Sequence, residues 1–509
     1  MNKQDQQIMK TQLSKRTFVS ELSKDYSLPD YQPEIKRLLK ISANILPPKT
    51  DFGMNDAVFS GNIDYYVLYL GVDNQMYCAP ISDEYSINMP LEGNRWGDYL
   101  DGFVDVLPEN ISGRVTAPRK ISIRSRIKTV ADVFSNIYAS QSFADSIGDE
   151  SIKKLQGKVL SASMDRVLSD TVNIGDEIIL DSRDGDVRVI CADGKVMLSE
   201  VKGNNNEAIL RGDAYVKILA CREEAGEPYV IYRKLPIFAS VPLKGADISS
   251  SVSGRGYINE LSVVVDEGRI TLDVGVIFDC TAIKNVPVEY TKDMYSTACA
   301  TRCEYKGYDV VSDRGAMNCN FTSSETRTLD ELGLDASSKL LDVTGCAFVD
   351  SVTLDENKMK VAGKIKYNCL MENADEYSLR EIEMPFSYLT DSKRGAKNNF
   401  VTAEVVSTRG KVDGERMSLD SEISLTCKAY DSCGISTLEA MHFGEGVDTA
   451  QNQFVVIFPS REDSVWSVAK KNYVSPERIL EANDGIASRL EGAELDDPKT
   501  LSSVHHIII

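Results

Sequence analysis

The sequence predicts a mainly β fold, in which three tandem β-sandwich-like repeats are followed by a small α/β module with the order β-α-α-β. Three observations support this prediction. Glycine and arginine anchors recur with one period along the chain. The segments after these anchors alternate between apolar and polar residues. The C-terminal end instead combines two short apolar runs with two short helical patterns. Alternation with period two is typical of a strand that buries one face.

The glycine anchors define the repeat most clearly. Gly61, Gly212 and Gly363 are each 151 residues apart, and each is followed by an apolar or alternating run. A fixed period of this kind indicates repeated structural units. We expect these glycines to lie where a strand begins, at a turn that needs a permissive backbone.

The arginine anchors keep nearly the same period. Arg119, Arg269 and Arg416 are 150 and 147 residues apart, and near-strict alternation follows each of them. Such residues could form an anion site. The simpler interpretation, which we favour, is that each arginine lies at a strand entrance and pairs with a nearby carboxylate.

The anchors divide the chain into successive segments. The expected division is an N-terminal tail 1–22, repeats 23–155, 156–300 and 301–445, a linker 446–452 and the α/β module 453–509. Two stretches, 33–40 and 127–160, have a helical pattern, and the second is expected to link the first two repeats.

Charge and hydropathy exclude several classes of protein. The chain has 509 residues, a formal net charge of −20 and a pI near 4.8. Nucleic acid is not expected as a partner, because phosphate contacts need a basic face. No window approaches eighteen apolar residues, so no membrane span is expected. The polar N-terminus lacks a secretory signal, which predicts a protein that begins in the cytosol.

The eleven cysteines are scattered, and there is no CxxC motif. Cys299 and Cys303 are four residues apart, but no second pair of Cys or His lies nearby to complete a zinc site. Most of the cysteines follow apolar strand patterns, which favours small buried side chains. Oxidative cross-linking late in the life of the protein remains an alternative.

The chain is poor in catalytic motifs. It has three histidines, and none of the HExxH, GxSxG or P-loop patterns occurs. A glycosidase needs two carboxylates in an aromatic-lined cleft, and the two tryptophans, Trp96 and Trp466, offer little stacking surface. We therefore expect no enzymatic activity, no cofactor and no metal.

The C-terminal module can be interpreted element by element. Phe454–Phe458 is a candidate strand, and Ser475, Pro476 and Glu477 are a suitable start for the second helix. Ile507–Ile509 forms the last strand. The expected core of the module consists of Val456, Trp466, Val468, Ala469, Ile479 and Leu480.

Two stretches resemble known families. Ser23–Ile45 contains Leu28-Pro29-Asp30, then Pro33-Glu34-Ile35, then Arg37-Leu38-Leu39. This pattern is similar to the opening motif of SPOCS-domain proteins of endospore-forming bacteria, with Glu34 where Asp is usual. The C-terminal order, its Trp and its Val-Ser-Pro-Glu turn resemble a LysM domain. Together the two resemble SipL-type spore coat morphogenesis proteins.

The LysM resemblance implies a binding site in two segments. These are the turn Arg461, Glu462, Asp463 and Ser464, and the loop Asn483, Asp484, Gly485 and Ile486. LysM domains typically bind glycans that contain N-acetylglucosamine. Glu462 replaces the usual glycine of the turn, and the loop after Ile486 is long and acidic, so a protein partner fits at least as well. Asn483 is expected mainly as a helix cap and Trp466 mainly as core.

The resemblance therefore implies a non-enzymatic scaffold or adaptor in spore coat assembly. It would act in the mother-cell cytoplasm at the forespore surface, and its C-terminal module would dock to a basement protein of the SpoIVA type. The alternative is a cell-wall or cortex anchor that binds peptidoglycan.

Overall fold

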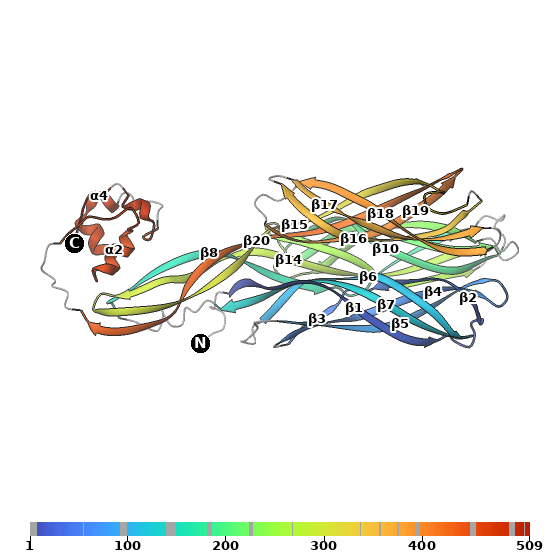
Figure 1. Cartoon of the computed structure of the whole chain (residues 1–509), viewed down its shortest axis with the longest axis horizontal. Coiled ribbons are helices and arrows are strands. Elements are labelled where there is room, and N and C mark those ends of the chain that lie inside the picture. Colours follow the sequence, from blue (N-terminus) through green and yellow to red (C-terminus); the bar gives the residue numbers. More distant parts are fainter. Residues whose placement is uncertain are drawn as a thin grey trace.

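The structure is a computed structural model. It describes residues 8–509 except 54, 92–98, 139–148, 181–185, 223–227, 267, 336, 356–357, 374–375, 392–396, 448–454, 488–493 and 503. Antiparallel strands form nearly all of it, so the predicted mainly β class is confirmed. Figure 1 shows an elongated molecule with a wide β body, a narrow stalk and a small module at the end of the stalk.

The body consists of three units that follow one another along the chain. The first contains β1 (Ile8–Ser27), β2 (Ile35–Ile45), β3 (Lys49–Phe52), β4 (Asp56–Gly71), β5 (Met76–Pro90), β6 (Tyr99–Ala117) and β7 (Lys120–Tyr138). The second contains β8 (Ile152–Leu168), β9 (Val172–Ile179), β10 (Val187–Asn204), β11 (Glu207–Arg222), β12 (Pro228–Pro242), β13 (Ser251–Asp266) and β14 (Arg269–Ser296). The third contains β15 (Cys299–Thr328), β16 (Lys339–Asp355), β17 (Lys358–Asn373), β18 (Glu376–Asp391), β19 (Asn398–Asp413) and β20 (Arg416–Gly446).

The same strand order recurs in each unit. One sheet has its middle strand between two neighbours, as in β2-β4-β5, β10-β11-β12 and β16-β17-β18. The other sheet pairs the first strand of the unit with its last, as in β1-β7-β6, β8-β14-β13 and β15-β20-β19. A contact between Thr11 of β1 and Val310 of β15 joins the first and third units into a six-stranded sheet.

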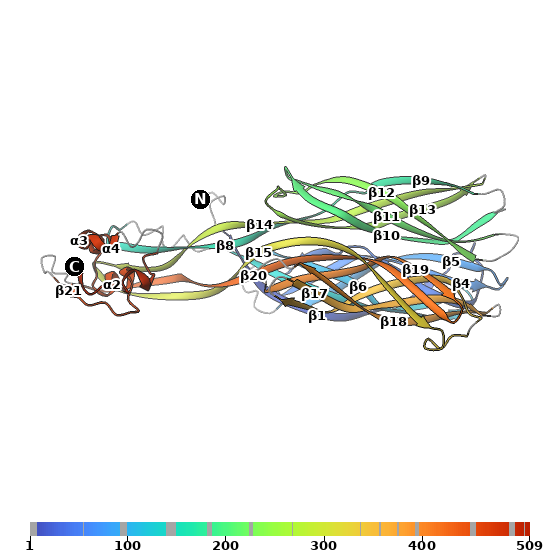
Figure 2. The same cartoon turned by 90° about the horizontal axis from the view of Figure 1, so that it is seen from above.

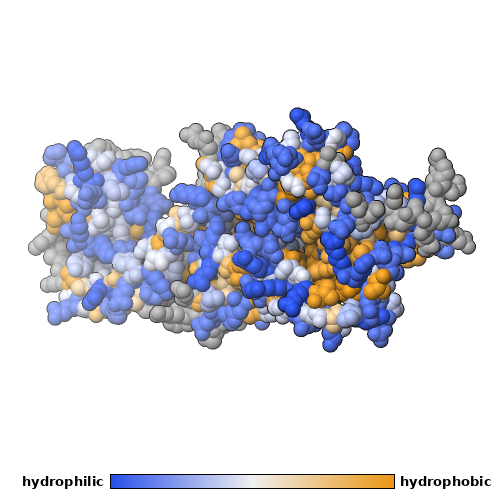
Figure 3. Space-filling view, turned by 45° about the vertical axis from the view of Figure 1, so that its right-hand side comes forward, coloured by the Kyte–Doolittle hydropathy of each residue, from blue (hydrophilic) through white to orange (hydrophobic). Residues whose placement is uncertain are grey.

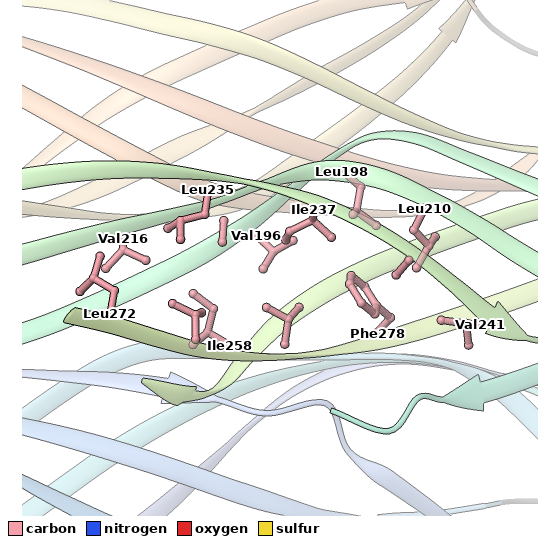
Figure 4. Packing of buried hydrophobic residues seen from close by; sticks show 14 of the residues in the cluster. Val196, Leu198, Leu210, Val216, Leu235, Ile237, Val241, Ile258, Leu272 and Phe278 are labelled. Atoms are coloured by element: carbon pink, nitrogen blue, oxygen red, sulfur yellow. The ribbon is translucent and has the colours of Figure 1, made fainter. Parts of the chain in front are cut away.

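Each unit buries an apolar core between its two sheets. In the second unit, Leu210 and Val216 of β11 face Leu272 and Phe278 of β14 (Figure 4). The alternation seen in the sequence produces this arrangement, because every second side chain of a strand points toward the facing sheet.

The glycine anchors lie within the middle strands β4, β11 and β17, so the expectation that they begin strands is wrong. Their role is close packing. A Cβ atom on Gly212 would lie 2.2 Å from the Met197 carbonyl oxygen, and one on Gly363 would lie 2.1 Å from that of Phe348. A side chain at either position would therefore force neighbouring strands apart.

Arg119 lies in the turn directly before β7, whereas Arg269 and Arg416 are the first residues of β14 and β20. Arg119 donates to the backbone oxygen of Asp30 at 2.9 Å, and Arg269 lies 3.5 Å from Glu177. Leu28 is buried beside Arg119 and donates its N–H to the Arg119 carbonyl at 2.8 Å. The opening motif therefore closes the first unit around this turn.

Three segments differ from expectation. Residues 8–22, expected in an N-terminal tail, belong to β1. Helices were expected at 33–40 and 127–160, but residues 35–40, 127–138 and 152–160 are strands in β2, β7 and β8, and residues 139–148 lie outside the described part of the chain. β2 has bulges between Ile35 and Arg37 and between Leu38 and Lys40. These bulges disrupt period two, so buried positions recur at helix-like spacing. β7 lies between β1 and β6 and buries both faces in part, which hides its alternation.

The stalk consists of the outer ends of β8, β14, β15 and β20, here residues 152–160, 287–296, 299–311 and 432–446. β8 pairs with β14, and β15 pairs with β20. Figure 2 shows the two ribbons running from the body to the C-terminal module. The expected linker 446–452 starts at the last residue of β20, and its residues 448–452 lie outside the described part of the chain.

Candidate functional site

The C-terminal module, residues 455–509, has the expected order of elements. β21 (Val456–Ile457) pairs antiparallel with β22 (Ile507–Ile508), and between them lie α2 (Val465–Lys471), α3 (Pro476–Ala482), α4 (Asp484–Ala487) and the 3-10 helix η2 (Pro498–Thr500). The two helices predicted from the sequence are α2 and α3. α4 and η2 were not predicted from the sequence.

Serine caps position both helices. The Ser475 hydroxyl accepts the Arg478 N–H at 3.2 Å, and Pro476 occupies the first turn of α3 as predicted. At α2, Ser464 and Ser467 form a reciprocal capping box, in which each hydroxyl accepts the backbone N–H of the other serine. Such caps satisfy N–H groups that have no partner within the helix.

The turn Arg461–Ser464 divides into a buried and an exposed half. Asp463 accepts from Lys471 Nζ at 2.6 Å and from the Ser460 N–H at 2.8 Å. The hydrogen bonds to Lys471 and to the Ser460 backbone lower the pKa of Asp463 to about 2. Ser464 is buried as the α2 cap. Arg461 and Glu462 are the two exposed residues of the turn.

The loop Asn483–Ile486 is also largely structural. Asn483 caps α3 and joins it to β22: its amide donates to the Ile479 and Ile508 carbonyls, and its oxygen accepts the Ile508 N–H at 3.0 Å. Ile486 is buried in the module core, and Gly485 is exposed. The side chain of Asp484 lies outside the described part of the structure. The expected cap role of Asn483 is therefore observed.

Most of the predicted core is buried. Trp466, Val468, Ala469 and Ile479 belong to the core cluster, and Leu480 packs against it. The prediction for Val456 is wrong, because 47% of this residue is exposed. Adjacent residues of a strand point to opposite faces, so Ile457 points inward and Val456 outward.

The stalk provides part of the module's environment. Leu155 of β8 and Tyr295 of β14 belong to the same apolar cluster as the module core. The ring of Trp466 meets that of Tyr295 edge to face at 4.9 Å between centroids, and the Tyr295 hydroxyl donates to the Val474 carbonyl at 2.6 Å. Trp466 therefore packs against the stalk as well as within the module.

Asp293 of β14 adds polar interactions to the contact between the stalk and the module. Its carboxylate accepts from Trp466 Nε1 at 2.8 Å, from Lys470 Nζ at 2.7 Å and from the Tyr305 hydroxyl at 2.5 Å. Next to it, Lys292 pairs with Glu494 and Asp496 of the module. A bulge at Lys292 interrupts the pairing of β14 with β8 at this point.

No pattern in the sequence predicted this docking site on the stalk. A possible signal was the adjacent pair Lys292-Asp293 in the otherwise mostly apolar and aromatic strand end Val288–Tyr295. Opposite charges side by side in such a strand suggest a contact with another element, although they do not say which element.

The outer edge of the module presents apolar side chains. We call Val455, Val456 and Phe458 the outer edge; they are 42%, 47% and 68% exposed. The Phe458 ring lies 5.7 Å from that of His505. Figure 3 shows that polar residues cover much of one face of the molecule, while apolar residues reach the surface in the body and near the end that carries the module.

Comparison with known proteins produced no match to a family model, a curated protein or a solved structure. Within the described ranges, none of the helices is both long and apolar enough to cross a membrane. No group of three His, Cys, Asp or Glu side chains is arranged to hold a metal ion in the described part of the chain.

Proposed function

We propose that the chain is a non-enzymatic scaffold in spore coat assembly, and that its C-terminal module docks to a coat basement protein of the SpoIVA type. The observation that carries this proposal is the position of the module at the end of the stalk, away from the body (Figures 1 and 2). A module held there reaches a partner without obstruction by the three units. The SPOCS-like and LysM-like sequence patterns supply the class of partner and the setting in the mother cell at the forespore surface.

The docking surface proposed here is the part of the module that the stalk does not contact. It combines the exposed turn residues Arg461 and Glu462 with the outer edge. An exposed aromatic beside charged residues is typical of the anchor and rim of a protein interface. Trp466 does not belong to this surface while the module is packed against the stalk, because its side chain then contacts Tyr295 and Asp293.

The glycan alternative has less support from the geometry. Asp463 and Asn483, two of the polar side chains expected at a sugar site, make their hydrogen bonds within the module. A sugar hydroxyl would have to compete with these bonds.

Binding of the full-length chain to a purified SpoIVA-type ATPase tests the proposal. Phe458→Asp should weaken binding at least about tenfold, the typical loss for an interface anchor. The matched control is Phe238→Asp on β12, because Phe238 is 66% exposed and lies in the body. Equal binding by both variants would contradict the proposed surface. Retention of the wild-type chain on insoluble peptidoglycan, with no binding to the ATPase, would favour the anchor function instead.

A further inference from the structure

Three positions with the period of the repeat meet at the centre of the body. Lys40, Cys191 and Asp342 are 151 residues apart, and each directly follows an irregularity in β2, β10 or β16. Each lies across from a leucine of the middle strand of its unit. These leucines and the residues at the irregularities form one apolar cluster drawn from all three units, here called the central junction: Leu39, Leu68, Ile190, Leu219, Leu341 and Leu370.

Ion pairs connect the third unit to the other two at this junction. Asp342 accepts from Lys40 of the first unit at 2.9 Å and from Lys217 of the second unit at 2.8 Å. Burial alone would raise the pKa of Asp342, but Lys217 and Lys40 lower it far below its usual range. At the central junction, a buried ion pair therefore connects the first unit to the third, and another connects the second unit to the third.

At the contact between the first and second units, two thiols rather than an ion pair lie beside the central junction. Cys191 of β10 and Cys78 of β5 pack against the central junction, and the two side chains lie close enough to influence each other electrostatically. Leu68 faces Cys78 across β4 and β5, as Leu219 faces Cys191 across β11 and β10. Neither cysteine is part of a disulfide.

Arg188 connects the two strands that carry these thiols, β10 and β5. It donates from Nη1 to the Met76 carbonyl at 3.0 Å, and its guanidinium lies 5.1 Å from the centre of the Tyr77 ring. Arg188 and Cys191 lie on β10, and Met76 to Cys78 lie on β5. The two thiols are therefore kept as neighbours across a contact between units that are far apart in sequence.

We propose that Cys78 and Cys191 are a disulfide-forming pair that covalently joins the first unit to the second when the protein meets a small organic disulfide. One cysteine thiolate attacks a sulfur of the reagent, forms a mixed disulfide and releases one reagent thiol. The second cysteine then attacks the protein sulfur of the mixed disulfide and releases the other reagent thiol. The protein loses two S–H bonds and gains one S–S bond, while the reagent is reduced to two thiols.

The surroundings affect the rate of this reaction. The neighbouring Cys191 and burial raise the pKa of the Cys78 thiol, which slows attack at neutral pH. Tyr66, which lies close enough to both thiols for them to raise its pKa, lines a cavity of about 250 Å³ between the units. A small reagent in this cavity would therefore lie near the pair, and a mildly alkaline buffer should accelerate the exchange.

Cys319 and Cys427 provide an internal comparison. They lie on the paired strands β15 and β20, where Cys319 faces Leu425 and Met317 faces Cys427. Both belong to the third unit, and Cys427 is buried beside Met359 at 3.8 Å between sulfurs. A bond between them would not connect two units.

The experiment treats the folded full-length Cys433→Ser variant with bis(2-hydroxyethyl) disulfide. Cys433 is removed because it is exposed and would form a mixed disulfide. Peptide mapping without reduction should find the peptide of Cys78 joined to that of Cys191, and thiol titration should find two thiols fewer than before treatment. The thermal midpoint should rise, because the bond closes a long loop in the unfolded chain, and reduction should reverse the rise.

A second variant, Cys78→Ser in the same background, should show no linked peptide and no rise in the thermal midpoint. A bond between Cys319 and Cys427 in its place would overturn the proposal. So would recovery of Cys78 and Cys191 as free thiols or as separate mixed disulfides after prolonged treatment at mildly alkaline pH.

Discussion

The body and the C-terminal module achieve stability in different ways. Each unit of the body encloses its own core between two sheets. The module is small, and its core cluster includes Leu155 and Tyr295 of the stalk. A short chain buries too little apolar surface to be strongly stable by itself. We infer that the module depends on its docking contact, whereas the units depend on their own sheets.

The two regions nevertheless share one kind of connection. A single carboxylate, Asp342 at the central junction or Asp293 at the stalk tip, accepts from groups on two other parts of the chain. The surroundings differ: the side chain of Asp342 is 5% exposed and that of Asp293 is 17% exposed. Loss of the more deeply buried charge should therefore have the larger effect.

The largest effect is expected from Asp342→Asn. It removes the charge that compensates Lys40 and Lys217 and should lower the free energy of unfolding of the body by about 3–5 kcal/mol. Chemical denaturation measures this change. Asp391→Asn is the control, because its pair with Lys358 is exposed and screened by solvent, so its loss should change the free energy of unfolding little. Equal effects of the two variants would show that the central ion pairs are unimportant.

Trp466→Ala should come next and should affect the module alone. The change removes a side chain that is 4% exposed, together with its contacts to Tyr295 and Asp293, and should destabilise the module by about 3 kcal/mol or more. Hydrogen exchange should accelerate in α2 and α3 and stay unchanged in the body strands. Protection of α2 at the wild-type level would contradict a core role for Trp466.

Asp293→Asn should release the module with a smaller loss, about 1–3 kcal/mol, because the apolar contact with Tyr295 remains. In a Trp96→Phe background, Trp466 is the only tryptophan, and its fluorescence should shift to longer wavelength as water reaches the ring. Glu494→Gln is the control, since Glu494 is mostly exposed where it pairs with Lys292. Wild-type emission from the Asp293 variant would mean that this carboxylate does not hold the docked state.

The smallest effect is a pH dependence confined to the module. The pKa of Asp463 falls from its usual value of 3.8 to about 2 in the folded chain. A carboxylate with a lowered folded pKa stabilises the fold above its unfolded pKa, and this stabilisation is lost as the pH falls toward 2. The emission of Trp466 should report loosening in this window. Asp463→Asn should remove this component of the pH dependence, and an unchanged profile would exclude the Asp463–Lys471 pair as its source.

The local features of this protein were predictable from short stretches of sequence. Alternating residues indicate strands, Ser475 and Pro476 indicate the start of α3, and the apolar spacing places Trp466 inside the module. Each depends on neighbours a few residues apart, as in the hydrogen bond from the Arg478 N–H to Ser475. The bulges of β2 produced a wrong helix prediction for 33–40, because one extra residue changes the period of burial.

The binding residues implied by the LysM resemblance were only partly informative. Asp463, Ser464, Asn483 and Ile486 hold the module together, which leaves Arg461, Glu462 and Gly485 as the exposed positions among the residues whose burial the structure describes. The sequence pattern locates a turn and a loop correctly, but it cannot say which side chains point outward. The outward position of Val456 was equally unpredictable, because the two-residue strand β21 has too little alternation to assign a face.

The sequence by itself determined the mainly β class, the spacing of the glycine and arginine anchors and the helix caps of the module. Only the tertiary structure decided which charges and thiols meet. Lys40 and Asp342 are 302 residues apart, and Trp466 and Asp293 are 173 residues apart. Local patterns report interactions along one strand or helix, whereas these contacts depend on how whole sheets pack. The repeat predicts that Lys40, Cys191 and Asp342 occupy equivalent places, and the packing of the three units brings those places together.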